Sequence, residues 1–261
     1  MRHALSRAGW RRVLPFAAFM ALLGLRGAVP ADGSWGFDGR WLYGVTVLVV
    51  GGMLLAWRRE WGELSRQNLP DAREWLLALG VGLGVFALWI RLDAPWMSLD
   101  NATATFSPAD ATGRIDWTMV VVRMAGAALV VPVMEELFWR SFVMRWIVSE
   151  QFEGVPPQRV GLRAIVITTF LFTLSHTLWL AAVMAGLAYA LLYVRSGKLW
   201  LPVAAHAVTN FALGVWVVAT GNWQFWCLFL VRELLWRSAG PWSRFLSSRW
   251  PTTGRWRRPP T

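Results

Sequence analysis

Eight apolar runs, most of them close to the length needed to cross a lipid bilayer, follow one another along this chain of 261 residues. A helix needs about 20 mainly apolar residues to span the hydrocarbon core of a membrane. The runs lie at 13–30, 41–57, 75–90, 117–147, 162–178, 180–194, 199–219 and 223–236. They predict an all-α fold, a polytopic membrane bundle of about eight transmembrane helices. The fourth run is too long for one simple crossing, and the sixth and eighth are short.

Composition agrees with a membrane protein and argues against a nucleic-acid partner. Hydrophobic residues make up 56% of the chain, which contains 20 Trp and has a mean hydropathy of +0.42. The formal charge of +11 by itself suggests nucleic acid. However, the arginines cluster between apolar runs and at the two ends, which is typical of membrane topology. The single Cys excludes a disulfide framework within one chain.

The distribution of charge between the runs predicts the topology. Arginines gather before the first run, after the second, between the fourth and fifth, and after the sixth and eighth. The alternate connectors carry mostly Asp or no charge, so we expect both termini to be cytoplasmic. The basic, apolar N-terminus resembles a signal peptide but lacks a small-x-small cleavage site, and we interpret it as the first span. The Arg-, Trp- and Pro-rich C-terminal tail is expected to be disordered or to lie on anionic lipid.

Two adjacent carboxylates, Glu135 and Glu136, lie inside the fourth run, where each costs about 2.5 to 3.5 kcal/mol on insertion scales. Arg140 follows Glu136 at i,i+4, in the order that favours an ion pair. Glu135 is rotated by about 100° from Glu136 and faces away from the arginine. We therefore expect one neutralised carboxylate and one free one, and a free carboxylate in a poorly solvated site is a good proton acceptor. The alternative is that the pair snorkels at a helix end.

Two further apolar runs carry histidines with polar or aromatic residues one turn away. Phe172 precedes His176 by four residues, so its ring could pack on the imidazole, and His206 and Asn210 share a helix face. Taken singly, His176 is more often a satisfied core residue, and the His206–Asn210 pair is more often a contact between membrane helices. Glu, His, His and Asn on three spans together are the minimum set for an activated water and an oxyanion hole.

These residues also resemble the signature of a known family. Glu-Glu-x-x-x-Arg at 135–140, Phe-x-x-x-His at 172–176 and His-x-x-x-Asn at 206–210 look like the motifs of the CPBP/Abi intramembrane proteases, which include the endopeptidase of prenylated CAAX proteins. The resemblance covers roughly 117–215. Further phrases near the start and in the fourth run look more particularly like bacterial CAAX-protease-related proteins associated with exosortase and PEP-CTERM sorting.

The resemblance implies roles for the motif residues. Glu135 and His176 would activate the attacking water, His206 and Asn210 would stabilise the oxyanion, and Glu136, Arg140 and Phe172 would support the site. It also implies three parts of the chain: N-terminal transmembrane helices and a loop at 1–110, a catalytic core at 111–220, and a last transmembrane helix with a basic tail at 221–261. The implied location is the bacterial inner membrane, with a membrane-associated protein or peptide as substrate, the lipid bilayer as surroundings and exosortase-system proteins as further partners.

Two questions stay open from the sequence. The family has been described both as metalloproteases and as metal-free glutamate proteases. Glu, His and His are a plausible zinc ligand set, but the helical His-Glu-x-x-His motif is absent, so we favour no cofactor, with zinc as the alternative. The competing function is a non-hydrolytic binding or maturation partner in a sorting system. A small transporter is disfavoured because the sequence shows no inverted repeat.

Overall fold

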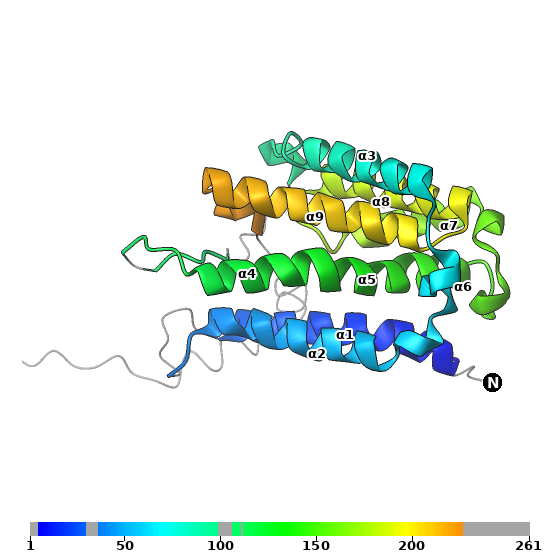
Figure 1. Cartoon of the computed structure of the whole chain (residues 1–261), viewed down its shortest axis with the longest axis horizontal. Helices are drawn as coiled ribbons and strands as arrows, with labels where there is room; N and C mark the ends of the chain where they lie inside the picture. The colour runs from blue at the N-terminus through cyan, green and yellow to red at the C-terminus, as the bar shows by residue number, and fades with distance from the viewer. Residues whose placement is uncertain (1–4, 30–35, 99–105, 111, 227–261) are drawn as a thin grey trace, which may run out of the picture.

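The computed structural model describes residues 5–29, 36–98, 106–110 and 112–226, and in this part of the chain helices are joined by connectors, without a β-strand. The helices alternate in direction along one axis (Figure 1). Their bounds are α1 Arg7–Ala28, α2 Leu42–Ala56, α3 Ala72–Trp89, α4 Trp117–Ala125, α5 Val131–Glu136, α6 Met144–Trp146, α7 Leu162–Thr173, α8 Trp179–Ser196 and α9 Trp200–Thr220. The predicted all-α class is confirmed.

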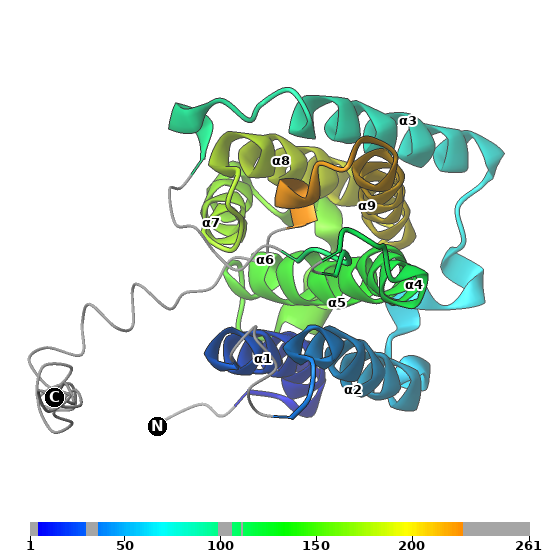
Figure 2. The same cartoon turned by 90° about the vertical axis from the view of Figure 1, so that its left-hand side faces the viewer.

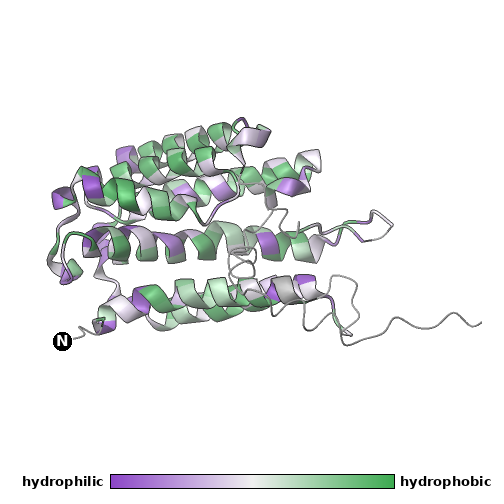
Figure 3. Ribbon diagram, turned by 180° about the vertical axis from the view of Figure 1, so that it is seen from behind, coloured by the Kyte–Doolittle hydropathy of each residue, from purple (hydrophilic) through white to green (hydrophobic). Residues whose placement is uncertain are grey.

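Six helical segments of the described part are long and apolar enough to cross a membrane. They are Arg7–Arg26, Gly39–Ala56, Ala72–Trp89, Trp117–Trp146, Trp179–Ser196 and Trp200–Thr220. Figure 3 shows hydrophobic residues along their whole length, in agreement with a multi-pass membrane protein. The predicted count of eight is not confirmed. Of the eighth run, 223–236, only the short 3₁₀ helix Trp223–Trp226 lies among the described residues, and the tail from 227 onward lies outside them.

Apolar length predicts a fifth span at 162–178, but α7 ends at Thr173 after 12 residues. The local hydrogen bonds explain this early end. The Ser175 hydroxyl donates to the carbonyl oxygen of Phe172 at 2.7 Å, and Nδ1 of His176 lies 2.9 Å from the same oxygen. Side chains that bond to nearby backbone compete with the helical ladder. The residues after Thr173 therefore leave the helix, and His176 lies in a turn between α7 and α8.

A single 30-residue helix, Trp117–Trp146, forms the centre of the bundle and comprises α4, α5 and α6. It lies between the α1–α2 pair on one side and α3, α7, α8 and α9 on the other (Figure 2). Two π-helical segments interrupt it, at Gly126–Val130 and Leu137–Val143. Such segments change the helical phase and are common at functional sites. Glu135 and Glu136 lie between the two segments.

Helix α3 packs closely on α9 because Gly82 has no side chain. A Cβ atom at Gly82 would lie 2.5 Å from the carbonyl oxygen of Ala205 and 2.8 Å from Cβ of Val208. The Thr209 hydroxyl also lies 2.8 Å from the Gly82 carbonyl oxygen. Helix α3, which lies in the predicted N-terminal part of the chain, thus fixes the position of α9, the helix that carries His206.

The arginine-rich connectors lie at one end of the bundle, together with the start of α1 (Figure 1). Ion pairs hold them there: Arg11 with Glu60, and Lys198 with Glu74 at 2.7 Å. This gathering of basic connectors is what the positive-inside rule requires of a membrane protein. The side of the membrane on which this end lies stays a prediction.

Candidate active site

Glu136 is fully buried and accepts two charged or polar donors through one oxygen. Nη1 of Arg140 lies 3.0 Å from Oε1 of Glu136, and Nδ1 of His206 lies 3.0 Å from the same oxygen. The first contact is the i,i+4 ion pair expected from the sequence. The second joins the central helix to α9. Arg140, which is 1% exposed, also donates from Nη2 to the carbonyl oxygen of Gly186 at 3.2 Å, so it contacts α8 as well.

Glu135 differs from its neighbour in having no partner among the described residues. Its side chain is 8% exposed, and none of the described hydrogen bonds or ion pairs reaches its carboxylate, of which Oε2 is buried. A buried polar group without a hydrogen bond is costly, and an unpaired carboxylate is more so. Two neighbouring carboxylates on α5 therefore differ in their contacts: Glu136 is paired, and Glu135 has no described partner.

Two aromatic rings and a backbone carbonyl hold His176. The Phe172 ring lies 4.3 Å from the imidazole between centroids, and the Trp89 ring meets it edge-on at 5.7 Å. Nδ1 of His176 lies 2.9 Å from the Phe172 carbonyl oxygen and 3.1 Å from the Ser175 hydroxyl. A carbonyl oxygen only accepts, so Nδ1 carries the proton and Nε2 keeps its lone pair. Trp89 comes from α3, and no motif in the sequence indicated it.

Asn210 bonds to a carbonyl that the central helix cannot satisfy itself. In the first π-helical segment the N–H of Val131 donates to the carbonyl oxygen of Gly126, five residues earlier. The next donor in this pattern would be Pro132, which has no N–H. The carbonyl oxygen of Ala127 is left without that donor, and Nδ2 of Asn210 donates to it at 2.8 Å. One amide proton of Asn210 is thereby used, and the other has no partner among the described hydrogen bonds.

The sequence reading missed Tyr189, which orients His206. The two rings are stacked, with centroids 5.0 Å apart and an angle of 19° between their planes. The Tyr189 hydroxyl donates to Oγ1 of Thr209 at 2.8 Å. Gly186 and Tyr189 lie three residues apart on a helix rich in Ala and Gly, and this small-residue face was the available signal of close helix packing.

The three motifs are connected by a continuous series of contacts. His176 packs on Phe172, and Cζ of Arg140 lies 4.7 Å from the centroid of the Phe172 ring. Arg140 pairs with Glu136, which bonds to His206. The described contacts include no direct bond between Glu135 and His176, so their sharing of one water stays a prediction.

The described residues show no preformed zinc site. Among them, no three or more His, Cys, Asp or Glu side chains are arranged to hold a metal ion. The described contacts occupy Oε1 of Glu136, which accepts from Arg140 and faces Nδ1 of His206, but none of them reaches Glu135 or Nε2 of either histidine. A tetrahedral zinc site needs three or four convergent ligands. Whether a metal takes part in the reaction therefore stays a prediction.

Residues 117–212 match the family model of the Type II CAAX prenyl endopeptidase Rce1-like proteins. The matched segment contains all of the motif residues described above. The match supports the predicted relationship to the CPBP/CAAX protease family, whereas the exosortase-associated subgroup stays a prediction. The comparisons with curated proteins and with solved structures found no match.

Proposed function

We propose that this chain, whose residues 117–212 match the Type II CAAX prenyl endopeptidase Rce1-like family model, is an intramembrane endopeptidase that uses Glu135 as its general base. The match to this family supports peptide hydrolysis in the membrane as the general activity. The observation that carries the specific assignment is the contrast between the two adjacent carboxylates. Glu136 is neutralised by Arg140 and His206, and the buried Glu135 has no described partner. An unneutralised carboxylate inside a membrane marks a functional site.

In the proposed reaction a water molecule bound at Glu135 attacks the peptide carbonyl carbon. Glu135 accepts one proton of this water as the new C–O bond forms. His176 helps to activate the same water through Nε2, because its Nδ1 is held by the Phe172 carbonyl oxygen. Collapse of the tetrahedral intermediate breaks the C–N bond, and the proton held by Glu135 passes to the leaving amine.

The oxyanion of that intermediate is stabilised by His206 and Asn210. Asn210 donates the amide proton that Ala127 does not use. His206 can donate from Nε2 only as the imidazolium, because its Nδ1–H is directed at Glu136. The Glu136 carboxylate stabilises that cation. Glu135, Glu136, Arg140 and a protonated His206 then sum to zero charge, which suits a site in hydrocarbon.

The test compares the C-termini of membrane proteins in cells that carry the wild-type chain or Glu135→Gln. Glu153→Gln is the matched control, because Glu153 lies exposed in the connector between α6 and α7. We expect a set of truncated C-termini that depends on Glu135 and is unchanged by the control. Unchanged C-termini in Glu135→Gln, at equal protein levels, would contradict hydrolysis and favour a non-hydrolytic maturation partner.

A further inference from the structure

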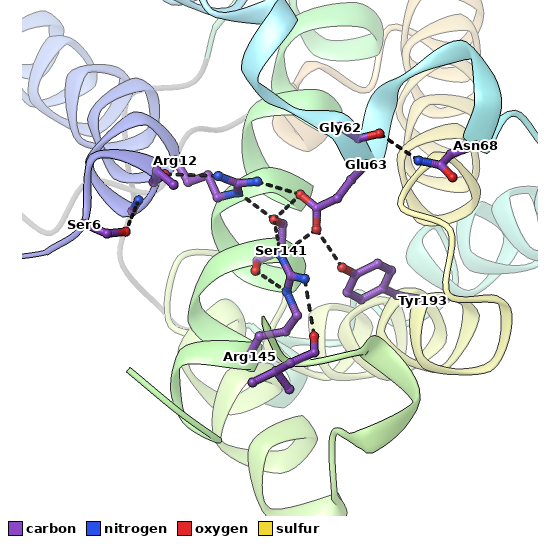
Figure 4. A network of polar contacts seen from close by, with 11 residues as sticks. Ser6, Arg12, Gly62, Glu63, Asn68, Ser141, Arg145 and Tyr193 are labelled. Carbon is purple, nitrogen blue, oxygen red and sulfur yellow. Dashed lines mark hydrogen bonds and ion pairs between the residues drawn. The ribbon is translucent and has the colours of Figure 1, made fainter. Parts of the chain in front are cut away.

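Five side chains from four parts of the chain meet at one end of the bundle, outside the candidate active site (Figure 4). We call this group the Glu63 clamp, and its members are Arg12 of α1, Glu63, Ser141 and Arg145 of the central helix, and Tyr193 of α8. Glu63 lies on the short 3₁₀ helix Gly62–Leu64, in the connector between α2 and α3. This connector precedes the segment that matches the family model.

Both oxygens of the Glu63 carboxylate are filled by donors. Oε1 accepts from Nη2 of Arg145 at 2.6 Å and from the Tyr193 hydroxyl at 3.0 Å. Oε2 accepts from Nη2 of Arg12 at 2.7 Å and from the Ser141 hydroxyl at 2.7 Å. Charge-assisted bonds of this length are among the stronger ones in proteins. One carboxylate thus fixes α1, the central helix and α8 to a single point.

The two arginines of the clamp, Arg12 and Arg145, are buried close to each other. Their positive charges therefore need the negative charge of Glu63. Arg12 is 4% exposed and Arg145 is 5% exposed. Their guanidinium carbons lie 5.2 Å and 5.4 Å from the centroid of the same Phe152 ring. Two buried cations around one ring repel each other, and the carboxylate between them offsets this repulsion. Without it, we expect α1 and the central helix to separate.

The clamp acts on the central helix, which carries Glu135 and Glu136, and on α8, which carries Tyr189. Ser141 follows Arg140, the partner of Glu136, in the second π-helical segment. Tyr193 lies one turn beyond Tyr189, whose ring stacks on His206. A shift of the central helix against α8 at the clamp is therefore transmitted directly to the Glu136–His206 contact.

We propose that Glu63 is a positioning residue for the reaction, which sets the register of the central helix against α8 and so the placement of the catalytic groups. This inference rests on the proposed function, since it assigns Glu63 to that reaction. None of the described hydrogen bonds of Glu63 reaches a proposed catalytic group. Misplacement of reacting groups by about 1 Å can lower turnover by about 100-fold. The loss is therefore expected in kcat, with KM nearly unchanged.

The variants are Glu63→Gln, which keeps the shape of the side chain, and Glu63→Ala. Glu60→Gln is the matched control, because Glu60 lies on the same connector and pairs with Arg11. Val120→Ala is a second control: Val120 is buried at the opposite end of the central helix, so this variant lowers stability without touching the clamp. All variants are compared as full-length protein in nanodiscs. The substrate is a peptide from a membrane protein whose C-terminus, in the comparison of cells described above, is truncated only when Glu135 is present.

Two readouts separate positioning from a general loss of stability. The first is the kcat of each variant relative to the kcat of wild type, measured well below the unfolding temperature of every variant. The second is the distance between spin labels at Val148 and Leu191, which are exposed at the end of the central helix and on α8. Cys227 is replaced by Ser in this background, so that only the introduced cysteines are labelled.

We expect both Glu63 variants to lose kcat and to shift or broaden the label distance, whereas both controls keep the wild-type values. An unchanged label distance, or a loss of kcat no larger than in Val120→Ala, would overturn the positioning role and leave the proposed protease intact. Absence of turnover in wild type would instead remove the proposed function, and the positioning role with it.

Discussion

Nδ1 of His206 lies 3.0 Å from Oε1 of Glu136, and this contact joins two helices whose residues are 70 positions apart. It gives the adjacent carboxylates different environments. Glu136 holds Arg140 and His206 in place, and Glu135, one position earlier on the helix, has no partner in the part of the chain that the structure describes. The two carboxylates should therefore respond differently to substitution.

Arg140→Ala should lower the folded yield in membranes, and Glu135→Gln should keep the yield and abolish turnover. Removing Arg140 leaves Glu136 buried without its cation, which typically costs about 3–5 kcal/mol. Gln at position 135 removes a charge that no described group neutralises. Yield is measured as monodisperse protein after extraction. Equal losses of yield in both variants would mean that a structural pair has been taken for a catalytic one.

Asn210→Ala should lower turnover by about 100- to 1000-fold, the usual cost of one oxyanion donor. It should also destabilise the protein, because the Ala127 carbonyl loses its donor, a cost of about 1–3 kcal/mol. Adding Pro132→Ala supplies a backbone N–H beside that carbonyl. The double variant should recover thermal stability and stay inactive. Recovery of activity in the double variant would show that Asn210 has only a structural role.

Gly82→Ala should destabilise the bundle by about 1–3 kcal/mol, since its methyl group would collide with the backbone of α9 at Ala205. Gly80 and Gly84 lie on the same helix, and a Cβ atom added at either would meet no other side chain or helix within 4 Å. Gly80→Ala and Gly84→Ala should therefore be neutral or slightly stabilising. Thermal unfolding in one detergent compares the three variants. A neutral Gly82→Ala would contradict the close packing of α3 on α9.

Stability should fall at acid pH through Glu63. Burial alone would raise the pKa of its carboxyl, but Arg145, Arg12 and the Ser141 hydroxyl outweigh this effect and lower the pKa below its ordinary 4.5. A group with a lowered pKa in the folded state stabilises the protein above its unfolded pKa, and this contribution is lost as the pH falls through the folded value. Unfolding temperatures from neutral pH to below 4.5 should decline less steeply in Glu63→Gln than in wild type. Parallel curves would contradict the prediction.

Six of the spans and the first ion pair could be predicted because they depend on local sequence. Apolar length indicates a membrane helix, and the i,i+4 spacing of Glu136 and Arg140 determines their contact. The end of α7 at Thr173 could not be predicted, because it results from competition between the Ser175 side chain and the helical backbone. Neither could the π-helical segments, which hydrophobic periodicity does not report.

Contacts between residues far apart in the sequence could not be predicted either. Glu63 is separated from Ser141, Arg145 and Tyr193 by 78, 82 and 130 positions, and nothing in the local pattern connects them. Trp89 and Tyr189 were missed for the same reason, because an aromatic residue in an apolar run is indistinguishable from ordinary packing until its neighbour across the helix interface is known.

The most direct measurement of the central claim is the turnover of purified protein after removal of metals, in wild type and in Glu135→Gln. The substrate is a peptide found in the comparison of C-termini, and bound zinc is quantified in the same samples. The account predicts that wild type keeps its turnover after chelation and that Glu135→Gln has none. Stoichiometric zinc, with activity abolished by chelation and restored by zinc, would contradict the metal-free mechanism and leave the protease assignment in place.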